Sequence, residues 1–364
     1  MKVFVTESRG LCPVRATEHM IPWLFFDSHR VSLTDLFCFC GSYAPTSRRF
    51  HKIQYPSSMF YELYWGLPMN IEKIYLIAGG DMRFIHLSAL LAKKGKVYMI
   101  GFDSGDDFPS DVTLLKNISE LKRQPDYVIL PMPVTTDGVV LNAPLLTKDT
   151  IQLSHILDLC HRDTLILGGK ITPKVREELE KRELRFADYL EREEFAVMNA
   201  VPTAEGTLQI VLEELPTLIM GKKVLITGFG RIAKILLKDF LALDAKVTVA
   251  ARKYKDLVWA EIYGADTVAV RDFGGTLHEY DVILNTVPAM IFGEEQLREI
   301  KPDCLIIDLA SRPGGVDFAA AAAMERKVIW ALSLPGKTAP LTAASILETT
   351  LQNCIKECEK GVVV

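Results

Sequence analysis

The sequence lacks the features that mark membrane, secreted and nucleic-acid-binding proteins. No uninterrupted apolar run reaches the roughly 18 residues that a membrane-spanning helix needs, and the chain does not begin with the basic-then-apolar layout of a secretory signal. Its 42 basic and 46 acidic side chains give a formal net charge of −4, so no basic excess would attract nucleic acid or an anionic membrane. We therefore expect a cytoplasmic protein that binds a small molecule.

Cysteine and histidine are present, but not in the patterns of a covalent or metal framework. The seven cysteines follow no regular spacing, and several lie within apolar strand or helix patterns, which indicates reduced thiols. The seven histidines show no metal-ligand spacing, so we expect no metal site. The chain also has no nucleophile elbow and no phosphate-transfer lysine motif. Evidence for the chemistry must therefore come from the predicted strands and the loops that follow them.

The length allows more than one domain. A chain of 364 residues, of which 49% are hydrophobic, is long enough for two ordinary cores. Residues 1–68 lack helical or strand periodicity, and we expect an irregular or disordered extension there. The change of character near Met69 raises the hypothesis that translation starts at that residue, and a genuine partner-binding extension is the alternative. Two α/β domains are expected at 69–200 and 201–340, and a helix at 341–364 is expected to pack back on the first.

Short apolar runs alternate with helical segments along both expected domains, which predicts parallel sheets wrapped by helices. A linker helix is predicted from Thr203 to about Leu215. In open sheets of this kind ligands gather beyond the carboxyl ends of the strands. The fold class is therefore α/β with two doubly wound parallel sheets, the second of Rossmann type. The predicted strands are 73–78, 96–101, 127–130, 164–167, 184–187, 223–227, 246–251, 281–285, 304–308 and 327–331.

A glycine-rich loop follows the strand at 223–227 and opens an amphipathic helix. The loop has the G-x-G-x-x-A pattern in the strand-loop-helix setting of dinucleotide-binding folds. Gly228 permits a tight turn, Gly230 lets the backbone approach a pyrophosphate, and Ala233 lets the helix pack closely on the strand. The helix amino terminus also supplies unpaired N–H groups and a dipole that favours an anion. We predict an NADP or NAD site here, and its pyrophosphate contacts are Gly228, Phe229, Gly230, Arg231 and Ile232.

The end of the next strand bears on the choice of cofactor. Sites that prefer NAD usually place an acidic residue about 20 residues beyond the loop to hold the ribose 2′-hydroxyl. This chain instead has Ala251, Arg252 and Lys253, and two cations suit the 2′-phosphate of NADP. NADP is therefore slightly favoured, with a solvated cation pair as the alternative. The turn of Thr286, Val287 and Pro288 is expected beside the nicotinamide ribose, or serves only to end its strand.

Seven blocks occur in an order that is more specific than any one of them. They are GGDMR at 79–83, NAVPTAEG at 199–206, GFGR at 228–231, AAR at 250–252, NTVPA at 285–289, IDLASRPGGVDF at 307–318 and LPGKTAP at 334–340. This set resembles the A subunit of dipicolinate synthase from endospore-forming bacteria over about residues 70–358. The first stretch of the chain departs from the family pattern.

The resemblance implies an NAD(P)-dependent oxidoreductase subunit in the mother cell of a sporulating bacterium. Its product would be dipicolinate, the calcium-chelating dicarboxylate of the spore core, and its substrate a dihydro- or hydroxytetrahydrodipicolinate precursor. The family acts with a flavoprotein-like B subunit of dipicolinate synthase, and we expect an oligomer. Two alternatives stay open: an enzyme like shikimate or alanine dehydrogenase acting on another small acid, and a non-catalytic nucleotide-binding scaffold for the B subunit.

A dicarboxylate substrate needs fixed donors at the junction of the two domains. Arg83 is a candidate clamp, and the alternative is that Asp81 caps a helix while Arg83 is solvated. The other candidates for substrate binding are Thr203, Ser311, Gly314 and Gly315. Thr203 is also consistent with a helix cap. The backbone amides of the two glycines are consistent with either an anion-binding concavity or an ordinary loop.

Proton removal and orientation have three candidate residues, namely Lys337, Glu205 and Asn199. Lys337 follows a proline and a glycine that would aim it into the cleft, provided that the site lowers its pKa. The alternative for Lys337 is a solvated surface lysine, and the alternative for Glu205 is a favourable charge in the first turn of a helix. Hydride transfer needs chiefly orientation and a nearby base, so no residue is singled out as that base.

Overall fold

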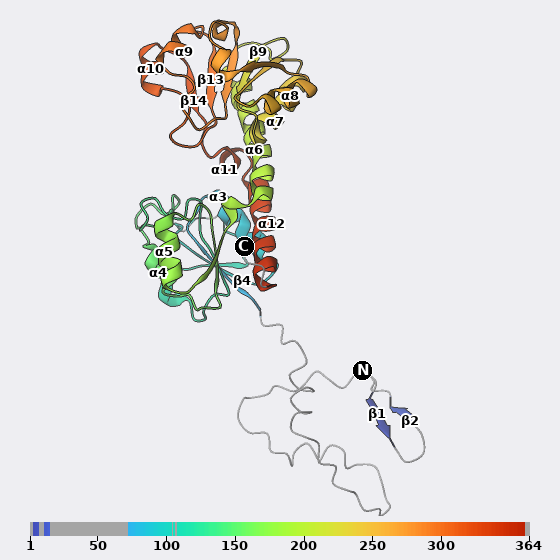
Figure 1. The fold of residues 1–364 in the computed structure, drawn as a ribbon. Helices are drawn as coiled ribbons and strands as arrows, with labels where there is room; N and C mark the ends of the chain where they lie inside the picture. The colour runs from blue at the N-terminus through green and yellow to red at the C-terminus, as the bar shows by residue number, and fades with distance from the viewer. Residues whose placement is uncertain (1–2, 7–10, 15–71, 104, 106–107, 361–364) are drawn as a thin grey trace, which may run out of the picture. The chain divides into compact units, whose positions relative to one another are not determined.

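The computed structural model describes residues 3–6, 11–14, 72–103, 105 and 108–360 (Figure 1). The chain divides into two compact units, Met1–Met69 and Asn70–Val364. In the first unit β1 (Val3–Thr6) pairs with β2 (Leu11–Val14) in antiparallel register. Apart from this strand pair, the predicted irregular extension lies outside the described residues. Within the described residues no helix is long and apolar enough to cross a membrane.

The second unit begins with a parallel six-stranded sheet in the order β5-β4-β3-β6-β7-β8. Its strands are apolar because both faces are covered by helices. In the central strand, Tyr75 and Ile77 join the core under α3 and α12, whereas Leu76 and Ala78 join the core under α4 and α5. The elements are β3 (Ile74–Ala78), α3 (Met82–Ala92), β4 (Lys96–Ile100), β5 (Val112–Leu114), β6 (Tyr127–Ile129), α4 (Leu153–Leu157), β7 (Leu165–Gly168), α5 (Pro173–Lys181) and β8 (Arg185–Asp188).

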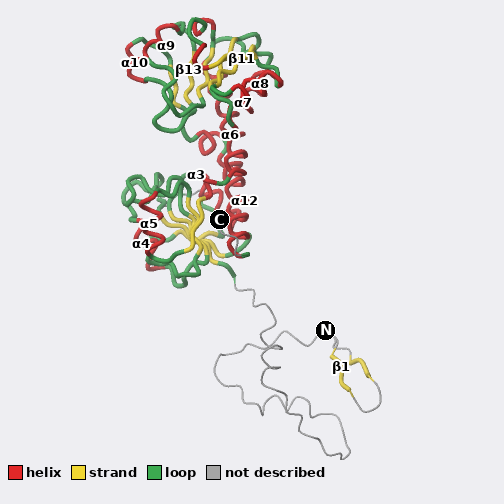
Figure 2. The backbone as a smooth tube through the Cα atoms, in the orientation of Figure 1, coloured by secondary structure: helices red, strands yellow, loops and turns green. Residues whose placement is uncertain are grey.

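A second parallel sheet of six strands has the order β11-β10-β9-β12-β13-β14. Figure 2 draws the strands of this sheet in yellow, with β11 and β13 labelled. Counted along the chain this is the 3-2-1-4-5-6 order of a Rossmann fold. The predicted α/β class with two doubly wound sheets is therefore confirmed. The elements are β9 (Lys223–Thr227), α7 (Arg231–Ala242), β10 (Lys246–Ala251), α8 (Tyr254–Ile262), β11 (Asp266–Ala269), β12 (Val282–Asn285), α9 (Glu294–Glu299), β13 (Leu305–Asp308), α10 (Phe318–Ala323) and β14 (Val328–Trp330).

The ten strands predicted from sequence are all present with boundaries within a residue or so. Two edge strands, β5 and β11, are absent from the prediction. Their residues are half-buried or exposed, so they lack the apolar run that identifies a strand covered on both faces. Short 3-10 turns complete the connections at Ile118–Glu120, Tyr189–Glu191, Val270–Asp272 and Leu277–Glu279.

The linker helix is longer than predicted. It is α6 (Glu193–Glu214), with Pro202 in its interior, so it begins at Glu193 rather than at Thr203. The interpretation of Thr203 as a helix cap is therefore wrong. Its hydroxyl donates to the Asn199 carbonyl at 2.8 Å, a bond within the helix. Buried Phe195 anchors the turns that precede the proline, so core packing adds to the helix there.

Two further helices follow β14, namely α11 (Leu334–Thr338) and α12 (Pro340–Glu359). The short α11 packs on α6, where a Cβ on Gly206 would lie 2.9 Å from the Thr338 hydroxyl. The long α12 packs against α3, and its Leu347 and Leu351 are fully buried in the core of the first sheet. The last helix of the chain therefore completes the first domain.

Candidate dinucleotide site

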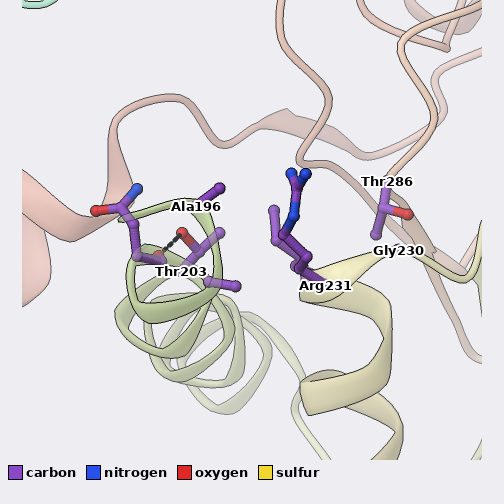
Figure 3. Close-up of a pocket in the computed structure, with 8 residues that line it drawn as sticks. Ala196, Thr203, Gly230, Arg231 and Thr286 are labelled. Carbon is purple, nitrogen blue, oxygen red and sulfur yellow. Dashed lines mark hydrogen bonds between the residues drawn. The ribbon is translucent and has the colours of Figure 1, made fainter. Parts of the chain in front are cut away.

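A cavity of 210 Å³ lies between α6 and the glycine loop. Figure 3 shows Ala196 and Thr203 on α6, with Gly230 and Arg231 at the start of α7 and Thr286 on the neighbouring loop. The cavity therefore joins the linker helix to the carboxyl ends of two Rossmann strands, where ligands of such sheets bind. Its lining residues are Ala196, Asn199, Ala200, Thr203, Gly230, Arg231, Ile232 and Thr286.

The glycine loop has the geometry that its sequence predicts. Gly228 has a φ of +89°, and a Cβ at this position would lie 2.6 Å from the Thr286 hydroxyl. Gly230 precedes α7 with a φ of −83°, and a Cβ there would meet no atom within 4 Å. No side chain caps the amino terminus of α7. Ala233 is fully buried against the sheet. The loop thus exposes the bare end of a helix, which suits an anion.

Arg231 gives this end of α7 a further positive charge. Its guanidinium forms a two-point ion pair with Glu193, with Nε–Oε1 at 2.9 Å and Nη2–Oε2 at 2.7 Å. Hydrogen bonding by Arg231 lowers the pKa of the Glu193 carboxyl. Both side chains are more than half exposed, so the pair is weak and accessible to water. Sequence reasoning missed this pair because its partners are far apart in the chain.

Cations gather where β10 and β11 end. Arg252 and Lys253 are exposed just after β10, and neither side chain is in an ion pair with a described residue. The parallel register pairs Ala251 with Ala269, which brings Arg271 beside them. Arg271 donates to the Tyr254 hydroxyl at 2.6 Å. Sequence reasoning missed Arg271 because β11 itself is absent from the predicted strands.

Of the turn after β12, only Thr286 lines the cavity. Its hydroxyl donates to the Thr227 carbonyl at 2.7 Å, which ties this turn to the strand that precedes the glycine loop. Val287 is half-buried, and Pro288 is exposed.

Arg83 is not brought to this cavity. It lies in the first turn of α3 and is only 6% exposed, so it is not solvated. Its Nε and Nη2 bind the Asp81 carboxylate at 2.9 and 2.6 Å, while that carboxylate also caps the helix. Gly336 of α11 covers the pair, since a Cβ there would lie 2.9 Å from Arg83 Nε. The charge of Arg83 is therefore already balanced inside the protein.

The remaining candidates divide between the cavity and other surfaces. Asn199 and Thr203 line the cavity, whereas Lys337 is exposed on α11. Glu205 is exposed near Asp239 of α7, whose pKa is raised by burial and further by the Glu205 charge. The structure therefore separates Glu205 from Asn199 and Thr203.

The loop after β13 does not offer free amides to an anion. The Gly314 amide donates to the Ser311 carbonyl at 2.9 Å, and the Gly315 amide donates to Asp308 Oδ2 at 2.7 Å. Both glycines are buried, while Ser311 is exposed. An anion-binding concavity built from these two amides is thus excluded by their internal hydrogen bonds. Among the described residues no group of three His, Cys, Asp or Glu side chains could hold a metal ion.

Comparison with known proteins gives two family matches. Residues 74–190 match the N-terminal domain of the dipicolinate synthase A subunit, and residues 198–334 match the NAD binding domain of D-isomer specific 2-hydroxyacid dehydrogenases. The chain is 30% identical over 286 residues to the A subunit of dipicolinate synthase from Bacillus subtilis (strain 168), covering 78% of this chain and 96% of that protein. The chain belongs to the dipicolinate synthase A-subunit family. The resemblance found in the sequence is confirmed.

Solved structures agree with this family. The A subunit of dipicolinate synthase from Bacillus halodurans matches with a TM-score of 0.71 and 29% identity over 78% of this chain and 97% of that one. The Bacillus subtilis A chain gives the same score and identity over 80% and 99%. A transhydrogenase from Sinorhizobium meliloti, at 12% identity and a TM-score of 0.57 over 79% and 94%, shares the fold. The second domain is thus of an NAD-binding dehydrogenase type, and a nicotinamide cofactor fits it.

Proposed function

We propose that this chain oxidises a dihydro- or hydroxytetrahydrodipicolinate precursor to dipicolinate, with NADP preferred over NAD as the hydride acceptor. It would act with the flavoprotein-like B subunit of dipicolinate synthase, in the cytoplasm of a sporulating mother cell. The observation that carries the proposal is the cavity shared by the glycine loop and α6. Relatives named as the A subunit of dipicolinate synthase, which match nearly their whole length, support the choice of reaction.

The residues at the glycine loop fit a dinucleotide. Bound NADP would supply the acceptor for a hydride from the substrate ring. Gly230 leaves open space above the start of α7, so the pyrophosphate would contact the backbone of Gly230, Arg231 and Ile232. The Arg231 guanidinium would release the Glu193 carboxylate and bind the phosphate oxygens instead. Arg252 and Lys253 would hold the 2′-phosphate, which supports the preference for NADP.

The substrate would lie against α6. The Asn199 side chain is half-buried at the cavity and makes no hydrogen bond with a described residue, so its amide is available to a substrate carboxylate. Thr203 already donates its hydroxyl proton to Asn199, which leaves its oxygen as an acceptor. An asparagine amide does not take up a proton near neutral pH, so Asn199 would orient the substrate. Glu205 and Lys337 do not line the cavity and receive no role there.

The test supplies the purified chain, with and without the B subunit, with the cyclic precursor freshly made from aspartate semialdehyde and pyruvate. NADP or NAD is added, and dipicolinate is monitored. We expect dipicolinate with matching NADP reduction in wild-type protein and none in Gly230→Asp, whose carboxylate would oppose the pyrophosphate. Gly274→Asp is the matched control, because Gly274 is exposed in open space. No binding of either dinucleotide by wild-type protein, whether or not the B subunit is present, would overturn the proposal.

One observation favours a second candidate function, a nucleotide-binding scaffold for the B subunit. None of the eight residues that line the cavity carries a base that titrates near neutral pH. A scaffold needs no base, because the chemistry would take place in the partner. Product that requires the B subunit yet is unaffected by Gly230→Asp would support this function. Oxidation of shikimate or alanine would instead indicate a dehydrogenase for another small acid.

A further inference from the structure

Three buried polar side chains lie side by side at the ends of three neighbouring strands of the Rossmann sheet. Thr227 ends β9, Asn285 ends β12 and Asp308 ends β13, and each is fully buried. The parallel register pairs Asn285 with both Thr227 and Asp308. We call these three residues the polar ladder. Buried polar groups in a strand core require partners, so the direction of each hydrogen bond matters.

Asn285 is the centre of the polar ladder, and all its hydrogen-bonding groups are used. Its Oδ1 accepts from the Thr227 hydroxyl at 2.6 Å and from the Val287 amide at 3.2 Å. Its Nδ2 donates to Asp308 Oδ1 at 2.8 Å and to the Val287 carbonyl at 3.0 Å. Because both oxygens of Asp308 accept from N–H donors, Asp308 fixes which end of the amide faces it. The orientation of Asn285 therefore follows from Asp308.

Asp308 is itself held by the backbone. Its Oδ1 accepts from the Ala310 amide at 3.0 Å, and its Oδ2 accepts from the Gly315 amide at 2.7 Å. No described cation pairs with it, so N–H donors alone balance its burial. A Cβ on Gly315 would lie 2.2 Å from Asn285 Nδ2, and one on Gly314 would lie 2.8 Å from Asp308 Oδ2. The two glycines are thus required for the loop to close over the polar ladder.

We infer that Asp308 is a positioning residue for the nicotinamide half of the cofactor, acting through Asn285. Asn285 binds both the N–H and the C=O of Val287, and so sets the turn that presents Thr286 to the cavity. Thr286 in turn binds the Thr227 carbonyl, directly before the glycine loop. The polar ladder thereby fixes the spacing between this turn and the pyrophosphate loop. The inference rests on the proposed function, since it assumes a dinucleotide at the glycine loop.

Asp308→Asn tests this with almost no change of shape. The Asp308 carboxylate accepts from three N–H donors, and an asparagine at this position has only one acceptor oxygen for them. The NH2 group of that asparagine must therefore face at least one of these donors, which leaves a hydrogen bond unmade. Asn285 would rotate to relieve this, and its bonds to Thr227 and Val287 would be lost. The turn at Thr286 would then shift, while the adenosine end of the site, at the end of β10, keeps its contacts.

The experiment measures the Kd of the full chain for NADP and for 2′,5′-ADP, which lacks the nicotinamide half. We expect Asp308→Asn to bind 2′,5′-ADP within twofold of wild type and NADP at least tenfold more weakly. The double variant Asp308→Asn, Asn285→Asp again places a donor opposite a carboxylate, and should recover part of the loss. If Asp308→Asn does not fold, Thr227→Val takes its place. It should also weaken NADP binding relative to 2′,5′-ADP binding, but by a smaller factor than expected for Asp308→Asn.

The outcomes separate this inference from the proposed function. An equal loss for both ligands would mean that Asp308 only supports the fold, and unchanged NADP binding would mean that the turn does not depend on it. Either result, or Thr227→Val without effect on the ratio, overturns the inference. Wild-type protein that binds neither ligand, with or without the B subunit, would instead overturn the proposed function.

Discussion

Replacing Gly230 by alanine should separate the fold of the glycine loop from its contact with the cofactor. Gly230 has φ −83° and ψ −165°, which alanine adopts freely, and the added Cβ would meet no atom within 4 Å. The backbone is therefore not strained, and the roughly 0.4–1 kcal/mol gained from a less flexible unfolded chain is offset because alanine is a poorer N-cap than glycine. The free energy of unfolding should change by less than about 1 kcal/mol. The same Cβ would occupy the space above the start of α7, where we propose that the pyrophosphate contacts the backbone, and it would hold the pyrophosphate away from these amides. Losing one charge-assisted backbone hydrogen bond of about 1.5–3 kcal/mol should raise the NADP Kd roughly 10- to 100-fold.

Gly228→Ala should show the opposite pattern at the other end of the loop. Gly228 has a φ of +89°, and its Cβ would lie 2.6 Å from Thr286 Oγ1 and 2.9 Å from Val287 Cγ2. The left-handed backbone alone costs an alanine about 1–2 kcal/mol, and the overlap adds to this. Thermal unfolding without ligand and calorimetry with NADP distinguish the two variants. Gly274→Ala, in open space away from the loop, is the control. Equal NADP Kd values for Gly230→Ala and the control would refute our path for the pyrophosphate.

Three further predictions concern the core, the cofactor choice and the thiols. Leu347→Ala, at a fully buried position of α12, should destabilise the first domain by about 2–5 kcal/mol in urea unfolding. Leu341→Ala is the control, because Leu341 is 68% exposed on the same helix, and it should change stability by less than about 0.5 kcal/mol. Similar values for the two variants would mean that α12 does not complete that core. Arg252→Ala should weaken NADP binding about tenfold and leave the NAD Kd unchanged in parallel titrations, because only NADP carries the 2′-phosphate, and an equal effect on both would contradict the assignment. Burial raises the pKa of Cys304 to about 12 and that of Cys354 to about 11, so both thiols stay protonated at pH 8 and should react with iodoacetamide only after unfolding, as mass spectrometry of their peptides would show. Because these values are raised in the folded state, the stability from the neutral thiols is present below the ordinary thiol pKa and is lost as pH rises toward 11 to 12.

The strands were predictable from sequence wherever both faces of the sheet are covered. β3 is an uninterrupted apolar run, and β9 has an apolar centre from Val224 to Ile226, because helices bury both strands from either side. The edge strands β5 and β11 form through hydrogen bonds to one neighbour, and their side chains remain half-exposed. Nothing in their local composition distinguishes such segments from loops. Their existence depends on the neighbouring strand, which a local pattern does not contain.

The start of α6 shows a different limit. Pro202 and Thr203 form a local pattern typical of a helix amino terminus, since proline is favoured in the first turn and threonine before it or nearby. In the structure Pro202 lies within the helix, and its missing N–H interrupts one bond of the ladder. The preceding turns persist because Phe195 is buried and Arg192 pairs with Glu357 of α12 at 2.6 Å. Tertiary contacts therefore outweigh a local signal, and the last helix of the chain supplies one of them.

The candidate site divides in the same way between local and distant determinants. The glycine loop was predictable because its turn, its bare backbone and its helix start all lie within a few consecutive residues. Thr227, Asn285 and Asp308 each look like an ordinary polar strand end, and only the register of β9, β12 and β13 brings them together. The Rossmann strand order makes these three strands neighbours, so the sequence together with that order would place the three residues side by side. The direction of their hydrogen bonds would still be missing. It depends on Gly314 and Gly315 closing over Asp308, and that direction is what links a buried carboxylate to the cofactor turn.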